Sequence, residues 1–260
     1  MGEKDHPDRI DDLVVLGRSH PEPIEDGRHT VCLGGYSPTH GFIRLYPTRM
    51  RMSELYRWNI VSVPVEYDGE DHRKESYKIE GSREEWDILH KKIEKVGELD
   101  YVEQYELVKE LATDCRERLN ENQISLGMVT PSEILDTYLE PTETETVQTD
   151  LTGQKLIGKN EFDYKLYVKY RCQDCEQKTP HDQHVIEWGV YQYWKKHDNP
   201  EGVIEALRLN DDDYSKFFFI GNLRNHPTAY VIISILRFKK DKLLARGAKP
   251  EEQSGFSDFM

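Results

Sequence analysis

A β-strand is predicted at residues 58–67, which read Trp58-Asn-Ile-Val-Ser-Val-Pro-Val-Glu-Tyr67. Further apolar runs precede it along the chain, and each is short and bounded by Gly, Pro, Asn, Asp or Ser. They are Leu13-Val-Val-Leu16, Thr30-Val-Cys-Leu33 and Gly41-Phe-Ile-Arg-Leu-Tyr-Pro47. Short strands at this spacing, with no helical segment between them, are typical of a small barrel. We therefore expect a β-barrel over residues 1–80.

The middle of the chain changes its periodicity. Ser82 and Glu85 form a capping-box pattern, which predicts a helical insertion over residues 81–130. The expected apolar faces of its helices are Trp86, Leu89, Ile93 and Val96, followed by Leu107, Val108, Leu111, Cys115 and Leu119. Residues 131–152 then carry six acidic residues and no basic one. Such a composition indicates an acidic linker over residues 131–160.

The C-terminal part of the chain is expected to be a second lobe. Residues 162–171 alternate strictly between two faces, which predicts a β-strand. Residues 184–196 have the spacing of a helix, and apolar strands follow near the C-terminus. We expect an α+β lobe over residues 161–246 and a disordered tail over residues 247–260.

The composition describes a folded and acidic protein. Among 260 residues the hydrophobic fraction is 37%, and fifteen Tyr, eight Phe and four Trp supply large apolar groups that disordered chains lack. Asp and Glu number 49 against 35 Lys and Arg, which gives a formal net charge of -14. A uniformly attractive surface for phosphate is therefore excluded, and any polyanionic partner must be met at a local basic patch.

No segment indicates a membrane protein. The most apolar runs, residues 216–220 and 230–236, are far shorter than the roughly 18 residues that a membrane span requires. The N-terminus is acidic and contains no apolar signal segment. We therefore expect a cytoplasmic protein whose four cysteines are reduced.

The clearest cluster of metal-binding residue types is Cys172-x2-Cys175-x5-His181-x2-His184. Thiolate and imidazole are the ligands that zinc prefers, and a Cys-x2-Cys turn presents two sulfurs to one centre. Because four protein ligands leave no open position, a structural zinc is predicted ahead of a catalytic one. If only three of them bind, a water could take the fourth position, with Glu187 as a base. Alternatively, the histidines lie in an exposed loop and bind no metal.

Basic residues are interleaved with aromatic residues in three stretches, 42–58, 164–171 and 237–246. Cations neutralise phosphates and aromatic faces stack on unpaired bases, so this mixture suits single-stranded or flipped nucleic acid. The alternative interpretation is a set of ordinary solvated strand faces with buried rings.

A polar loop at residues 222–226 lies between two apolar runs. Polar groups held there could form a recognition site, although a plain hairpin turn would look the same. Arg224 of this loop therefore joins the residues predicted to bind nucleic acid. The full set is Arg44, Tyr46, Arg49, Arg51, Arg57, Trp58, Lys165, Tyr167, Lys169, Arg171 and Arg224.

Several segments together carry a family resemblance. They are Leu13-Val-Val-Leu-Gly-Arg-Ser-His-Pro-Glu-Pro23, Arg28-His-Thr-Val-Cys-Leu-Gly-Gly35, Ser125-Leu-Gly-Met-Val-Thr-Pro-Ser-Glu-Ile134 and Gly221-Asn-Leu-Arg-Asn-His-Pro227. The chain resembles an uncharacterised prokaryotic family with OB-like barrels, similar to the dual OB-containing proteins of mobile elements and defence loci. The resemblance implies OB-like barrels and supplies no catalytic residues. It also implies a ligand set of Cys172, Cys175 and His184, without His181.

These observations favour an α+β fold, with an OB-like β-barrel that carries a helical insertion and a second α+β lobe. The first hypothesis is a non-catalytic nucleic-acid-binding protein, an accessory of a prokaryotic defence or mobile-element system, in which zinc braces the second lobe. The second is a zinc-assisted hydrolase acting on nucleic acid or nucleotides, with an open metal site and Glu187 as base. The third is a protein–protein adaptor that uses the acidic residues 131–152.

Overall fold

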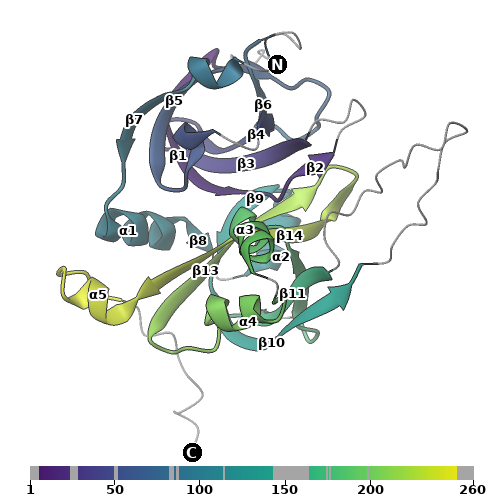
Figure 1. Ribbon diagram of the computed structural model, residues 1–260, viewed down its shortest axis with the longest axis vertical. Coiled ribbons are helices and arrows are strands. Elements are labelled where there is room, and N and C mark those ends of the chain that lie inside the picture. The colour runs from purple at the N-terminus through teal and green to yellow at the C-terminus, as the bar shows by residue number, and fades with distance from the viewer. Residues whose placement is uncertain are drawn as a thin grey trace, which may run out of the picture.

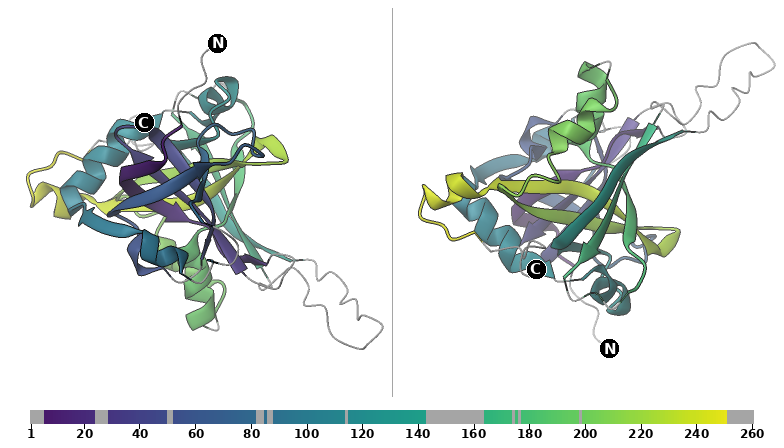
Figure 2. Two further views of the ribbon diagram at one scale, coloured as in Figure 1. Left: turned by 90° about the horizontal axis from the view of Figure 1, so that it is seen from above. Right: turned by 90° about the horizontal axis from the view of Figure 1, so that it is seen from below.

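The computed structural model describes most of the chain. The described residues are 6–23, 29–49, 52–81, 85, 88–113, 115–142, 164–173, 175, 177–197 and 199–250. Two sheets lie one above the other in Figure 1, and Figure 2 shows the same arrangement from above and below. Within the described residues, no helix is both long and apolar enough to cross a membrane.

The N-terminal sheet closes into a barrel. Its strands are β1 (Arg9–Arg18), β2 (Glu22–Pro23), β3 (His29–Ser37), β4 (Gly41–Arg49), β5 (Asn59–Tyr67), β6 (Ser76–Ile79) and β7 (Glu94–Glu98). The hydrogen-bonded path runs β1-β3-β4-β6-β5, and β5 pairs again with β1, so five strands close the barrel. β4 and β6 are parallel, whereas the other neighbours in the ring are antiparallel. The expected α+β class and N-terminal barrel are thereby confirmed.

The second sheet is built from the rest of the chain. Its strands are β8 (Ala112–Thr113), β9 (Leu126–Val129), β10 (Pro131–Pro141), β11 (Tyr164–Cys172), β12 (His181–Val185), β13 (Tyr214–Leu223) and β14 (His226–Lys239). The path runs β10-β11-β12-β14-β13-β9-β8, and β12 and β14 are parallel. Only Thr130 separates β9 from β10, so these two strands are one continuous piece of chain. The strand order of the sheet begins at β10 and reaches the same piece of chain again at β9.

The two sheets share one strand order. If β2, β7 and β8 are left out and residues 126–141 are counted as one bent strand, each sheet has five strands, which pair in the chain order first, second, third, fifth, fourth. In each, the third and fifth strands form the parallel pair. The sequence prediction of an undefined α+β lobe therefore missed a sheet that repeats the connectivity of the first barrel.

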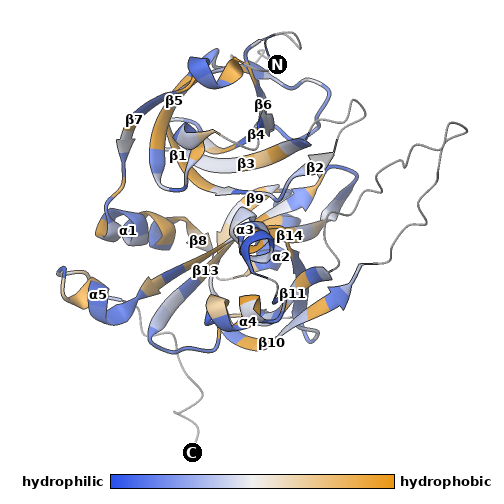
Figure 3. Ribbon diagram, in the orientation of Figure 1, coloured by the Kyte–Doolittle hydropathy of each residue, from blue (hydrophilic) through white to orange (hydrophobic). Residues whose placement is uncertain are grey.

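An apolar layer joins the two sheets, and β1 shows why. Leu13 and Val15 point into the core of the first barrel, whereas Val14 and Leu16 point toward the second sheet. Because successive side chains of a strand face opposite sides, the unbroken apolar run of β1 buries both of its faces. In Figure 3, β7 and the far end of β10 are mostly hydrophilic in colour, as expected for strands away from this layer.

The second sheet meets β1 with the same pattern. Phe217 and Phe219 of β13 enter the layer between the sheets, whereas Phe218 and Ile220 enter the core of the second sheet. Helix α1 (Tyr101–Leu111) completes the layer. It begins with a capping box in which Asp100 and Glu103 exchange hydrogen bonds with each other's backbone N–H.

Four short helices complete the described chain. They are α2 (Arg116–Glu121), α3 (Trp188–Lys196), α4 (Gly202–Leu207) and α5 (Lys240–Leu244), with 3-10 turns at η1 (Ser53–Leu55) and η3 (Leu89–Lys92). The predicted long helices of residues 81–130 are wrong in their extent. Val96 lies in strand β7, and the second helix is interrupted by β8. Pairing of β7 with β5 and of β8 with β9 outweighs the helical spacing in both places.

The predicted acidic linker is also wrong over residues 131–141, which form β10. The acids of this segment lie opposite basic residues of β11, so the acidic composition marked one half of a complementary strand pair. Strand β12 replaces the start of the helix predicted over residues 184–196, which begins at Trp188 as α3. Residues 143–163 and 251–260, where the rest of the linker and most of the tail were expected, lie outside the described residues.

We predict that Gly34→Ala destabilises the protein by about 1–3 kcal/mol, because a methyl group at Gly34 would overlap the ring of Phe219 in the layer between the sheets. Gly69→Ala is the matched control, because a Cβ there meets nothing within 4 Å. Urea unfolding of the two variants measures the difference. Equal stabilities would show that the sheets do not pack against each other at Gly34.

Candidate nucleic-acid interface and metal cluster

Two of the predicted phosphate-binding arginines are structural. Arg44 is 5% exposed and its Nη2 donates to the backbone oxygen of Ser125 at 3.2 Å. Arg57 forms an ion pair with Glu187, whose other carboxylate oxygen accepts the backbone N–H of Ile235 at 2.8 Å. Both arginines therefore connect the first barrel to the second sheet. Glu187, the candidate base of the hydrolase hypothesis, is occupied by these two interactions.

The basic residues of β11 are paired with acids across the sheet. The cross-strand neighbours are Lys165 and Glu140, Lys169 and Asp136, and Arg171 and Glu133. The Arg171 guanidinium lies 3.7 Å from the Glu133 carboxylate. These carboxylates would repel a phosphate bound beside the basic residues. β11 is therefore not the isolated basic strand that its sequence suggested.

Tyr167 stands in a ladder of rings that crosses three strands. Its ring stacks on that of Tyr138 with centroids 5.4 Å apart, and the ring of His184 lies 5.4 Å away on the next strand. Tyr138 donates to Asp182 at 2.9 Å, and burial followed by this carboxylate raises the pKa of Tyr138 to about 12. Both faces of Tyr167 have neighbours, so the ring is not placed to stack on a base.

Trp58 and the basic stretch 237–246 contact other parts of the protein. Trp58 is half-buried, with its ring 6.1 Å from that of Phe238. The ammonium of Lys242 lies 4.0 Å from the centroid of the Tyr101 ring. These residues gather around α1 and α5, at the opposite side of Figure 1 from the β13–β14 hairpin.

Three further residues of the predicted set are Tyr46 and Arg49, both on β4, and Arg51. Tyr46 is 37% exposed, and its hydroxyl accepts a hydrogen bond from Thr30 Oγ1 at 3.3 Å. Arg49 Nη1 lies 3.4 Å from His90 Nδ1. Arg51 lies outside the described residues. The predicted residues as a group are therefore not brought together in one groove.

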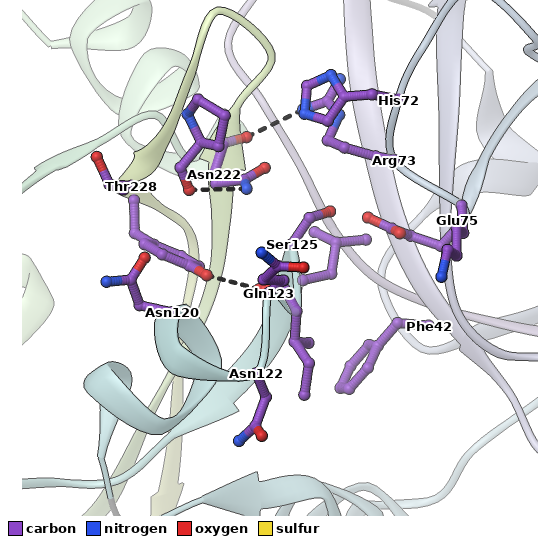
Figure 4. Close-up of a pocket in the computed structure, with 15 residues that line it drawn as sticks. Phe42, His72, Arg73, Glu75, Asn120, Asn122, Gln123, Ser125, Asn222 and Thr228 are labelled. Atoms are coloured by element: carbon purple, nitrogen blue, oxygen red, sulfur yellow. Dashed lines mark hydrogen bonds between the residues drawn. The ribbon is translucent and has the colours of Figure 1, made fainter.

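A different place, which we call the inter-sheet pocket, has the form of a binding site. It has a volume of about 690 Å³ and opens between the first barrel and the second sheet. Its lining residues are Phe42, His72, Arg73, Lys74, Glu75, Asn120, Asn122, Gln123, Ile124, Ser125, Leu126, Asn222, Pro227, Thr228 and Tyr230. Figure 4 shows Asn120 and Thr228 on one side of the pocket, and Glu75 and Phe42 on the other. The size is that of small-molecule sites.

The first wall is the loop between β5 and β6, residues 68–75. Asp71 holds this loop in shape, because its carboxylate accepts bonds from the backbone and the guanidinium of Arg73. Burial alone would raise the pKa of Asp71, but the hydrogen bonds and charge of Arg73 lower it to about 2. Lys78 also reaches back to Asp68 at 3.0 Å. The loop is thus organised before any ligand arrives.

The second wall is the hairpin between β13 and β14. Asn222 donates from Nδ2 to the backbone oxygen of Pro227 at 2.9 Å, which closes the hairpin. Arg73 Nη1 donates to the backbone oxygen of Asn222 at 3.0 Å, and Arg224 donates to that of Glu70 at 2.5 Å. Two hydrogen bonds therefore tie this hairpin to the loop of the first barrel, and Arg224 makes one of them without lining the pocket.

The third wall is the end of α2 and the turn after it. It carries the side-chain amides of Asn120, Asn122 and Gln123, and Gln123 adopts a positive φ of 54°. Tyr230 donates its hydroxyl proton to the backbone oxygen of Ile124 at 2.6 Å, which fixes the turn against the hairpin. Sequence analysis missed these amides, although an Asn-rich turn between apolar residues is a recognisable signal.

The pocket offers both donors and acceptors. Asn222 Oδ1 and Glu75 Oε1 are buried and accept no hydrogen bond from any described residue, although Arg44 lies 4.0 Å from Glu75. Buried polar atoms are normally satisfied, so each is a candidate acceptor for a ligand N–H. Lys74 and His72 are exposed at the rim and can meet negative charge.

A separate group of side chains could hold a metal ion. Ligand atoms of Cys115, Cys175 and His181 all lie within 4.8 Å of one another, and we call these residues the Cys/His cluster. Cys172 lies close to the cluster: the pKa of its thiol is raised by burial and then by neighbours that include the Cys115 thiol. The prediction thus found two of the three cluster residues, Cys175 and His181. It missed Cys115, which is remote in sequence and was interpreted as a core residue of a helix.

His184 does not join the Cys/His cluster. His181 and His184 are three positions apart on β12, so their side chains point to opposite faces of the strand. The ring of His184 instead lies 6.1 Å from that of His20. Burial, followed by the charges of His20 and Lys165, lowers the pKa of His184 to about 4. The ligand set that the family resemblance implied is therefore not brought together.

We predict that His184 makes stability fall on acidification. Its pKa is 6.5 in the unfolded chain and about 4 in the folded protein, so between these values only the unfolded state takes up the proton. The contribution of His184 to the free energy of unfolding should be greatest above pH 6.5. It should decrease toward pH 4, by about 3 kcal/mol at most. Urea unfolding at pH 7.5 and 5 should show a smaller loss for His184→Asn than for the unaltered protein; equal losses would contradict the assignment.

Comparison with known proteins adds a partial match. Residues 9–110 match the model of a family described as Domain of unknown function (DUF8758). The matched region contains the first barrel, β7 and most of α1. No curated protein matches the chain.

Proposed function

We propose that this chain is a non-catalytic nucleic-acid-binding protein made of two OB-like barrels, and that the inter-sheet pocket takes an unpaired base. One observation carries the proposal: equivalent loops of the two sheets line the same pocket. The loop 68–75 and the hairpin at 222–230 each connect the fourth strand of a sheet to the fifth.

The strand order supports the OB-like assignment. OB-folds are five-stranded Greek-key barrels that bind oligonucleotides with the second and third strands and with the loops after the first and fourth strands. In the first barrel, Phe42 of β4 and the loop 68–75 occupy two of these positions. The fold alone does not determine function, so the proposal depends equally on the chemistry of the pocket.

The pocket chemistry suits a nucleobase. A base edge carries donors and acceptors in its plane, and the pocket opposes them with the amides of Asn122 and Gln123 and the acceptors of Glu75 and Asn222. In a duplex these edges are paired, so the ligand is single-stranded or flipped. Lys74 at the rim would neutralise an adjacent phosphate.

For the Cys/His cluster we propose zinc as the metal, because thiolate sulfur and imidazole nitrogen are its preferred ligands. Such a metal would brace the second sheet and take no part in chemistry on nucleic acid. The resemblance to dual OB-containing proteins of mobile elements and defence loci supports an accessory role in such a system.

We predict salt-dependent binding of a labelled single-stranded oligonucleotide, measured by fluorescence anisotropy across a salt series. Asn122→Ala combined with Gln123→Ala should weaken binding about 30-fold, since two hydrogen bonds of about 1 kcal/mol each are lost. Lys74→Glu should weaken binding. It should also reduce the slope of log affinity against log salt concentration by about 1, the contribution of one phosphate contact.

Lys196→Glu is the matched control for Lys74→Glu, because Lys196 is an exposed residue of α3 and does not line the pocket. It makes the same change in net charge and should alter affinity less. Affinity that is independent of salt, or equal for the two charge-reversal variants, would contradict the proposed site.

A further inference from the structure

The Cys/His cluster has the dimensions of a tetrahedral zinc site. Zinc–sulfur bonds of about 2.3 Å and zinc–nitrogen bonds of about 2.0 Å place ligand atoms roughly 3.5–3.8 Å apart in a tetrahedron. Cys175 Sγ lies 3.4 Å from His181 Nε2, and Cys115 Sγ is within 4.8 Å of both ligand atoms. Cys172, at the end of β11, lies near Cys115 but outside the group whose ligand atoms are all within 4.8 Å of one another, so its sulfur has to move closer to become the fourth ligand.

One sulfur of the cluster accepts a backbone N–H. Glu117 N donates to Cys115 Sγ at 3.4 Å. A donor aimed at sulfur favours the thiolate, which is the form that binds metal. The backbone at the start of α2 is therefore arranged for a negative sulfur atom at Cys115.

His181 also has the support that metal-binding histidines normally show. Its Nε2 faces Cys175, whereas its Nδ1 lies 3.9 Å from the carboxylate of Glu117. Glu117 is held in turn by Arg116 at 2.6 Å. This separation is longer than a hydrogen bond, but a carboxylate beside the second ring nitrogen favours a proton there and leaves the first nitrogen for the metal.

The alternatives for these thiols are less consistent with their surroundings. All four cysteines are free, and no disulfide joins the three sulfurs of this site. Three thiols so close together are stable as a group only when protonated or when a cation balances their charge.

We propose that Cys115, Cys172, Cys175 and His181 form a closed, structural zinc site that fastens the start of α2 to the β11–β12 connection. The proposal deepens that of zinc in the Cys/His cluster, and it is independent of nucleic-acid binding. Four protein ligands leave no position for water, so the site is structural. The metal would connect the segment between β8 and α2, at Cys115, with the β11–β12 connection of the same sheet.

Zinc per chain in the full-length protein, purified under reducing conditions, tests the ligand set. One zinc per chain is expected for the unaltered protein, for His184→Asn and for Cys32→Ser, the matched thiol control. Cys115→Ser and Cys172→Ser should each lose the metal. Removing zinc with a chelator should lower the unfolding temperature of the unaltered protein, and added zinc should restore it.

Several results would overturn this assignment. They are an unaltered protein that takes up no zinc, full zinc retention in Cys115→Ser or Cys172→Ser, and a disulfide within the site detected by mass spectrometry. If the serine variants do not fold, cobalt substituted into the unaltered protein decides the question: three thiolate ligands in its absorption spectrum support the site, and two or none contradict it. Oligonucleotide affinity is a separate readout, so failure of one proposal is distinguishable from failure of the other.

We also predict that Glu117→Gln weakens zinc affinity by about 10- to 100-fold while zinc still binds at saturation, because Glu117 orients His181 without contacting the metal. Competition with a chromophoric chelator measures the change. Glu121→Gln, at the other end of α2, makes the same substitution outside the cluster and should leave the affinity unchanged. Equal affinities of the two variants would contradict the role of Glu117.

Discussion

The apolar layer between the two sheets is the constraint on which the rest of the structure depends. β1 supplies side chains to the first barrel from one face and to the layer from the other, and β13 does the same for the second sheet. Close contact at Gly34 leaves no room for a side chain between the sheets. Because the sheets are fixed against each other in this way, the loop 68–75 and the β13–β14 hairpin are held at one pocket.

Charge in this protein is used largely for internal structure. Arg44 and Arg57 connect the sheets, and the acids of β10 lie across from the bases of β11. A buried ion pair or hydrogen-bonded arginine contributes to the specificity of packing, and removing one partner leaves the other uncompensated. Counting basic residues along the sequence therefore overestimated the number of positive charges that are available to bind phosphate.

The sequence predicted local elements better than their partners. The apolar runs of the first barrel and the alternation of residues 162–171 are short-range signals, and strands formed at both. The second sheet was missed because its first strand is acidic and partly exposed, and only pairing with β11 explains that composition. Cys115 belongs to a cluster assembled from segments remote in sequence, which no spacing rule can identify.

Photo-cross-linking of a single-stranded oligonucleotide carrying a brominated base tests the central claim most directly. The bound oligonucleotide is irradiated, and the cross-linked peptides are identified by mass spectrometry. The two-barrel account predicts cross-links within residues 72–75, 120–126 and 222–230, which line the inter-sheet pocket. Cross-links confined to β10 and β11 or to α5, or none at all under conditions of binding, would contradict it.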